Sequence, residues 1–186
     1  MHIERINPTD SVSAAISAPG AVAEGMKLAG VYTVECHTPE GELVWRETFP
    51  NLVTTVGKNH ALDNELAGSA YTAAWYLGLI SSTSYTTGPA AGDTMASHSG
   101  WTEDQNYSQG ARPTAAWNAA SGGSKAFSAA LTFTMNATTT IKGAFLTSVS
   151  TKGGTTGTLY SAGLFTGGDQ PVVSGNSLSC SYVASA

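Results

Sequence analysis

The side chains best suited to chemistry lie close together between positions 93 and 104. Asp93, His98, Glu103 and Asp104 are present there, and Trp101 lies among them. A carboxylate, an imidazole and an aromatic wall could support hydrolysis or sugar binding. The stretch also fits a structural role, in which Asp93 caps one or two helical turns over 93–98 and Trp101 anchors a long loop. We favour the structural role and keep a hydrolase using the 93–104 loop as a remote alternative.

Other motifs that carry chemistry are missing from the sequence. No histidine stands at metal-ligand spacing with another histidine or cysteine, and His37, next to Cys36, points to the opposite side of a strand. The segment 20–27 approaches a phosphate-binding loop, but Met26 separates Gly25 from Lys27 and no Ser or Thr follows. We therefore expect no cofactor, no metal and no enzymatic activity.

The four tryptophans, at positions 45, 75, 101 and 117, allow two interpretations. Exposed together, they would form a platform for carbohydrate. Three of them lie in predicted strands among apolar residues, where large aromatic side chains usually anchor the core. The sequence favours core anchors.

Charged residues make up only 11% of the chain and are unevenly distributed. Residues 1–105 contain four basic and twelve acidic side chains, whereas residues 106–186 contain four basic and one acidic. This asymmetry could favour head-to-tail contact between copies, although strands that use Ser and Thr at their surface explain it better. No basic stripe is present, so we expect no nucleic-acid partner.

Membrane and disulfide chemistry are also limited by the sequence. No apolar run approaches the roughly 20 residues that span a bilayer, and no signal-peptide core follows the polar start. We therefore expect no membrane partner and synthesis in the cytoplasm. Cys36 and Cys180 each share a strand face with large apolar residues, which predicts two buried thiols. A disulfide between them remains open if the first and last strands pair, although a reducing cytoplasm disfavours it.

Alternation of apolar residues predicts the fold class. Within 126–135, one face is formed by Phe127, Ala129, Leu131, Phe133 and Met135. Further strands are predicted at 30–37, 42–49, 73–80, 114–119, 140–150, 158–165 and 178–184, with Gly143 and Gly163 marking bulges or bends. Short strands separated by Gly-rich turns are typical of an antiparallel β-sandwich or a jelly-roll-like fold. The protein is thus predicted to be mainly β.

Three further segments complete the predicted organisation. Residues 1–27 are rich in Ala and Ser and have no large aromatic side chain, which indicates an extended N-terminal arm before a sandwich domain over 28–186. One short α-helix is predicted at about 56–67. The polar connection 81–112 is long enough to form a packed binding surface or to carry function.

A resemblance rests on several short motifs in a fixed order. They are NLVTTVGKN at 51–59 with Leu62 and Leu66, WYLGL at 75–79, DTMASH at 93–98, GWTE at 100–103, Tyr107, Arg112 with Pro113, IKGAF at 141–145 and GTLYS at 157–161. This order resembles a family of small virion structural proteins of tailed bacteriophages, described as capsid decoration or cement proteins. The similarity covers about residues 28–184 and brings no catalytic residues.

The resemblance implies a phage capsid decoration protein on the head surface of the virion, bound across neighbouring subunits of the major capsid protein. It also implies a homo-oligomer, with a trimer favoured. The alternative within the virion is a tail or fibre component, either a joining or a receptor-binding protein, which a Trp-lined exposed groove with glycan binding would favour. The N-terminal arm and the 81–112 loop are the expected contact elements. Their candidate interface residues are Ile16, Pro19, Val22, Met26, Met95, His98, Trp101, Tyr107 and Arg112.

Overall fold

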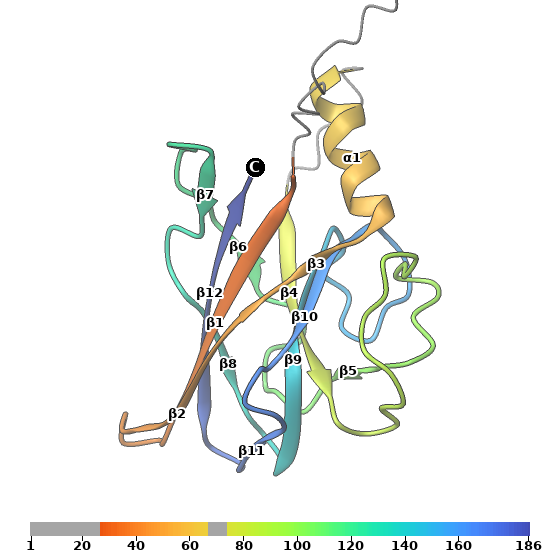
Figure 1. The fold of residues 1–186 in the computed structure, drawn as a ribbon. Coiled ribbons are helices and arrows are strands. Elements are labelled where there is room, and N and C mark those ends of the chain that lie inside the picture. The colour runs from red at the N-terminus through yellow and green to blue at the C-terminus, as the bar shows by residue number, and fades with distance from the viewer. Residues whose placement is uncertain (1–26, 67–73) are drawn as a thin grey trace, which may run out of the picture.

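The computed structural model describes residues 27–66 and 74–186, which form two antiparallel β-sheets packed face to face and one helix (Figure 1). The predicted class, a mainly β protein with antiparallel sheets and a single short helix, is confirmed. The predicted N-terminal arm lies outside the described residues except for Lys27. The four interface candidates in it, Ile16, Pro19, Val22 and Met26, therefore lie outside them too.

The five-stranded sheet is built around the first and last strands of the described chain. Its strands are β1 (Ala29–His37), β2 (Leu43–Pro50), β7 (Ser124–Ala126), β8 (Leu131–Thr134) and β12 (Ser177–Ser185). β1 pairs with β12 along its whole length, from Ala29 opposite Ser185 to His37 opposite Ser177. β2 extends the sheet beyond β1, and β7 and β8 both pair with β12 on its other side.

The seven-stranded sheet faces the first one and carries the long connections. Its strands are β3 (Leu52–Val53), β4 (Trp75–Ser81), β5 (Glu103–Asp104), β6 (Thr114–Ala115), β9 (Thr139–Thr147), β10 (Leu159–Leu164) and β11 (Gln170–Val172). β9 is central, with β10 and β11 on one side and β4 on the other. β5 and β6 pair with β4, so the 81–112 connection begins and ends against this sheet.

The helix α1 (Thr55–Leu66) agrees with the predicted 56–67. Thr54 caps it, because its hydroxyl oxygen accepts a hydrogen bond from the backbone N–H of Gly57 at 3.0 Å. Gly57 has a further role, since a Cβ at this position would collide with the carbonyl oxygen of Tyr160 on β10. The glycine therefore lets the first turn of the helix lie directly on the sheet.

The main core fills the space between the two sheets. Alternate residues of β1 and β12 point into it, and the facing sheet contributes Leu77, Leu79 and Leu146. From β1 and β12 these residues are Tyr32, Val34, Cys36, Leu178, Cys180 and Tyr182. Both cysteines are buried and free, as predicted for small apolar side chains, although their strands do pair. Burial raises the pKa of the Cys36 thiol to about 11.

Two predicted strands are shorter than expected. The run 126–135 is interrupted, because β7 and β8 pair with different halves of β12 while Phe127 and Ser128 turn toward residues 116–118. Ala129, expected on the buried face, is exposed as a result. The predicted strand 114–119 keeps ladder pairing only at Thr114–Ala115.

Of the two strand glycines predicted to mark bulges or bends, Gly143 lies at an irregularity of its strand and Gly163 does not. Ile80 of β4 lies opposite Gly143 and Ser81 opposite Ile141, so the extra residue of β9 at this register shift is next to Gly143. The shift on β10 lies between Leu159 and Ser161, away from Gly163. A Cβ on Gly143 would collide with the backbone of Gly163. Glycine is therefore needed at 143 for close approach of the two backbones.

Phe133 gives a direct test of the core. Its side chain is fully buried and meets the ring of Tyr107 edge to face, with centroids 4.9 Å apart. Phe133→Ala should lower the free energy of unfolding by about 3–5 kcal/mol, because it leaves a cavity and removes an aromatic contact. Thr132→Ala, on the exposed face of the same strand, should change it by less than about 0.5 kcal/mol. Urea unfolding of both variants measures the difference, and a loss below about 1 kcal/mol for Phe133→Ala would contradict this packing.

Candidate functional site

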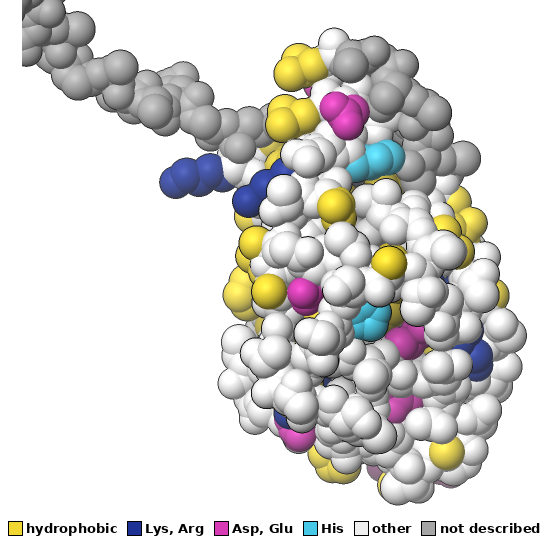
Figure 2. Space-filling view, turned by 90° about the vertical axis from the view of Figure 1, so that its right-hand side faces the viewer, with side chains coloured by type: hydrophobic (Ala, Val, Ile, Leu, Met, Phe, Trp, Pro, Cys, Tyr) yellow, Lys and Arg dark blue, Asp and Glu magenta, His cyan; other side chains and the backbone are white. Residues whose placement is uncertain are grey.

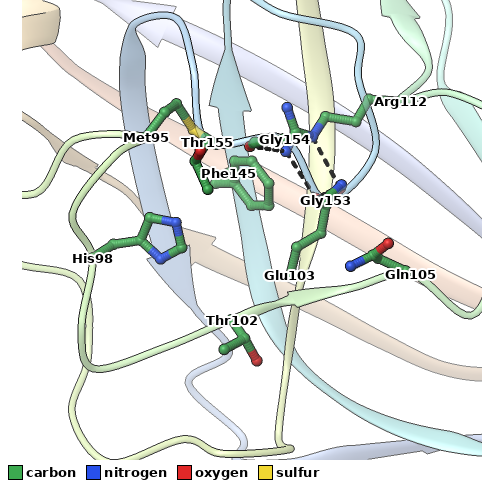
Figure 3. A pocket seen from close by; sticks show the side chains of 10 residues that line it. All are labelled: Met95, His98, Thr102, Glu103, Gln105, Arg112, Phe145, Gly153, Gly154 and Thr155. Atoms are coloured by element: carbon green, nitrogen blue, oxygen red, sulfur yellow. Dashed lines mark hydrogen bonds and ion pairs between the residues drawn. The ribbon is translucent and has the colours of Figure 1, made fainter.

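The candidate site is a cavity of about 230 Å³ on the side of the seven-stranded sheet turned away from the main core. The 82–102 connection covers this side and buries a second apolar cluster that includes Ile80, Met95, Trp101 and Phe145. The cavity contains two of the four side chains singled out for chemistry, His98 and Glu103 (Figure 3). Its other lining residues are Met95, Thr102, Gln105, Arg112, Phe145, Gly153, Gly154 and Thr155.

Trp101 anchors the loop. The indole is buried, lies against Phe145 with centroids 5.3 Å apart, and donates its N–H to Asp93 Oδ2 at 2.9 Å. His98 stacks on the same indole at 4.1 Å, and its Nδ1 donates to the Trp101 carbonyl oxygen at 2.9 Å. The imidazole is thus held by Trp101 and not by a carboxylate.

The helical turn predicted over 93–98 is absent. Thr94 and Ser97 instead exchange backbone hydrogen bonds of 3.0 and 3.2 Å across a tight β-turn. Asp93 caps no helix, because its carboxylate accepts hydrogen bonds from the Ala90 backbone N–H and the Trp101 indole. The aspartate therefore joins the two ends of this loop segment.

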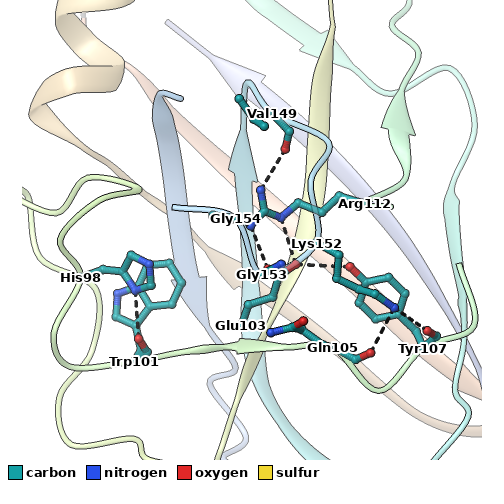
Figure 4. Close-up of polar contacts among 10 residues, drawn as sticks. All are labelled: His98, Trp101, Glu103, Gln105, Tyr107, Arg112, Val149, Lys152, Gly153 and Gly154. Carbon is teal, nitrogen blue, oxygen red and sulfur yellow. Dashed lines mark hydrogen bonds and ion pairs between the residues drawn. The ribbon is translucent and has the colours of Figure 1, made fainter. Parts of the chain in front are cut away.

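The cavity contains a buried ion pair between Glu103 and Arg112. Arg112 Nε donates to Glu103 Oε1 at 2.9 Å, and an Arg112 Nη donates to Oε2 at 2.8 Å. The side chains are only 1% exposed for Arg112 and 6% for Glu103. Arg112 also donates to the carbonyl oxygens of Val149 and Gly154, which ties the 103–112 segment to the β9–β10 connection (Figure 4).

The Glu103 carboxylate is saturated with donors. Beyond Arg112, it accepts hydrogen bonds from the Tyr107 hydroxyl at 3.2 Å and the Gly153 backbone N–H at 2.6 Å. Burial, followed by the charge of Glu103, raises the pKa of Tyr107 far above its ordinary value, so the phenol remains a donor. Lys152 lies over the Tyr107 ring at 4.1 Å and donates to the carbonyl oxygens of Gln105 and Tyr107.

Asp104 lies outside the cavity because neighbouring residues of a strand point to opposite faces. It is buried and accepts hydrogen bonds from Ser81 Oγ at 3.2 Å, Thr139 Oγ1 at 2.8 Å and the Asn106 backbone N–H at 2.9 Å. The four groups of the hydrolase hypothesis are therefore not brought together. Glu103 is paired with Arg112, and Asp93 and Asp104 have other partners. His98 is hydrogen-bonded to the carbonyl oxygen of Trp101 instead of to one of these carboxylates (Figure 4).

The structure changes the role expected for most of the interface residues of the loop. Met95, Trp101, Tyr107 and Arg112 are buried in the monomer, because they fasten the loop to the sheet. His98 alone of the five is partly exposed. The part of the loop that a partner could touch is consequently its exposed backbone and small side chains, positioned by these four anchors.

Sequence reasoning did not foresee the Glu103–Arg112 pair or the participation of Lys152, Gly153 and Gly154. The only available signal was the low charge of the chain, which makes each charged residue in a long loop notable. Within residues 27–66 and 74–186, no group of three or more His, Cys, Asp or Glu side chains could hold a metal ion.

Comparisons with known proteins add no identification: no family model matches the chain, and no curated protein matches it. In the described part of the chain, no helix has the length and apolar character needed to cross a membrane.

The buried Glu103–Arg112 pair leads to a prediction about stability. Arg112→Met should lower the free energy of unfolding by about 3–5 kcal/mol, because the Glu103 carboxylate would remain buried without a cation. The matched control is Arg46→Met, which removes a cation that is 61% exposed and paired with Glu35, and should cost about 0–1 kcal/mol. Adding Glu103→Leu to Arg112→Met should restore part of the loss. Chemical denaturation measures all three variants, and equal losses for Arg112→Met and Arg46→Met would contradict a structural role for the buried pair.

Proposed function

We propose that this protein is a bacteriophage capsid decoration protein that binds across neighbouring major capsid subunits and stabilises the head. It acts without catalysis, as a homo-oligomer with a trimer favoured, on the outer surface of the head. The motif order described above motivates the proposal. The observation that carries it is the outer face of the five-stranded sheet, which is formed by short side chains along β12 and the adjoining part of β1.

This outer face is well suited to close contact with another protein. Val31 and Val183 lie opposite each other in the β1–β12 register and are 42% and 43% exposed. Around the two valines the face carries Thr and Ser side chains, among them Thr33 and Thr48, whose hydroxyl oxygens lie 3.1 Å apart. Farther along β1 the same face carries Glu35, which forms ion pairs with Arg46 and His37. Short side chains lose little conformational entropy when a partner covers them.

The opposite side of the molecule also supports a binding role. Figure 2 shows that charged side chains are scattered sparsely among uncharged ones on the face it presents. The 82–112 segment is fixed by Trp101 and by the buried ion pair before any partner arrives. A surface that is already ordered loses less conformational entropy on binding. Because many copies bind one shell, a modest binding free energy per subunit is enough to stabilise it.

The outer face can be tested on heads that lack the protein. The purified chain is mixed with heads of the phage that encodes it, and bound protein is measured by co-sedimentation. Wild type should bind saturably and raise the temperature at which heads release DNA. Val183→Glu should weaken binding at least tenfold, because it places a charge in the proposed contact.

Val173→Glu is the matched control, since Val173 is 52% exposed but follows β11, which belongs to the other sheet. It should bind as wild type does. Equal binding by all three proteins would reject the outer face as the contact surface. Absence of saturable binding by wild type would reject the decoration function itself.

The N-terminal arm is the second proposed contact element, which we expect to clamp an adjacent subunit. Deletion of residues 1–27 should leave a folded sandwich, because the described core uses residues beyond them. Attachment to heads should become weaker. Circular dichroism melting and co-sedimentation together measure both effects. A truncated protein that does not fold would place the arm in the core.

A further inference from the structure

We propose that a groove at the α1 end of the sandwich binds a neutral saccharide. The groove has a volume of about 370 Å³, within the range of about 300–1,000 Å³ of small-molecule sites. It lies where the main core reaches the surface, near the end of the molecule that carries both α1 and β7 (Figure 1). Two tryptophans and a tyrosine line it, Trp75, Trp117 and Tyr160, together with the imidazole of His60 and the apolar side chain of Leu146.

The aromatic rings are held in place by other rings. Trp75 lies 5.2 Å from Tyr160 and 5.3 Å from the imidazole of His60, measured between centroids, and both contacts are inclined. Trp117 meets Phe127 edge to face at 4.8 Å. All three lining aromatics are only half-buried. The rings are thus already positioned, which lowers the entropic cost of binding a ligand.

The polar ends of these rings distinguish them from the other tryptophans. Trp45 donates its indole N–H to the Pro171 carbonyl oxygen, and Trp101 donates to Asp93. Within the described residues, the indole N–H groups of Trp75 and Trp117 and the hydroxyl of Tyr160 make no hydrogen bond. Half-buried Trp and Tyr side chains combine an apolar ring with an available hydrogen-bond donor, and so suit a ligand that has both an apolar surface and hydrogen-bonding groups.

A pyranose ring has these two characters, since its C–H groups form an apolar face and its hydroxyls point outward. The charges at the groove favour a neutral ligand. Glu65 from α1 and Lys125 from β7 both line it and are exposed, so a cation would meet Lys125 and an anion would meet Glu65. Hydroxyl groups can donate to the carboxylate and accept from the ammonium. A quaternary ammonium, the usual ligand of aromatic cages, fits this pair of charges less well.

Saccharide binding is a property separate from attachment to heads and can be measured on the full chain alone. The probes are three neutral trisaccharides, maltotriose, cellotriose and chitotriose, followed by saturation-transfer NMR and tryptophan fluorescence. At least one should bind with a dissociation constant below about 10 mM, which corresponds to a weak single site. Trp75→Ala and Trp117→Ala should each weaken that binding at least tenfold. Tyr160→Phe, which removes only the hydroxyl, should weaken it by a smaller factor.

Trp45→Ala is the matched control, because it removes an indole that does not line the groove. It should bind the saccharide as wild type does. If an alanine variant does not fold, the exposed pair Glu65→Ala and Lys125→Ala replaces it, and each should reduce affinity with an unchanged melting temperature.

Three results would overturn the proposal: no binding of any trisaccharide, binding unaffected by the groove variants, or tighter binding of choline than of the sugars. Saccharide binding by a chain that does not bind heads would favour the receptor-binding tail or fibre alternative for the protein as a whole.

Discussion

The pairing of β1 with β12 is the interaction on which the rest of the structure depends. It joins the two ends of the described chain along strands of nine residues each. The entropy lost when almost the whole chain is closed into a loop therefore has to be offset by the contacts of these two strands. The buried aromatic and aliphatic side chains of both strands, with Tyr32 and Tyr182 centroids 4.5 Å apart, supply that stabilisation. β2 pairs with β1, and β7 and β8 pair with β12, so β1 and β12 form the centre of this sheet.

The same two tyrosines connect the sheets to each other. Tyr32 hydroxyl lies 2.7 Å from Ser161 Oγ on β10, and Tyr182 hydroxyl accepts a hydrogen bond from Asn51 Nδ2 at 2.7 Å. Buried hydroxyls need such partners, so these bonds restrict how the sheets can slide against each other. Tyr182 also contacts Trp117, with centroids 6.0 Å apart. Trp117, one side of the aromatic groove, is therefore positioned in part by β12.

Local sequence patterns predict those elements whose structure is determined by residues close together in the chain. β1, β2, α1 and β12 agree with prediction within about two residues, since strict alternation and a capped helix are local properties. The interruption between β7 and β8 is different, because it depends on residues 116–118 arriving beside Phe127. Likewise, nothing near Glu103 in the sequence indicates that Gly153 and Arg112 would saturate its carboxylate, as these partners come from separate connections. Long-range polar contacts of this kind decide which candidate residues are available for chemistry.

Glu103 and Asp104 show why a chain with so few charges buries two adjacent carboxylates. They point to opposite sides of a two-residue strand, and each is surrounded by its own donors: Arg112, Tyr107 and Gly153 for Glu103, and Ser81, Thr139 and Asn106 for Asp104. Buried charges seldom add net stability, but a wrong conformation would leave them unpaired at high cost. We infer that they select one conformation for a segment that has little ladder pairing of its own. A connection ordered in this way keeps its exposed surface constant from copy to copy, which any repeated contact on a lattice requires.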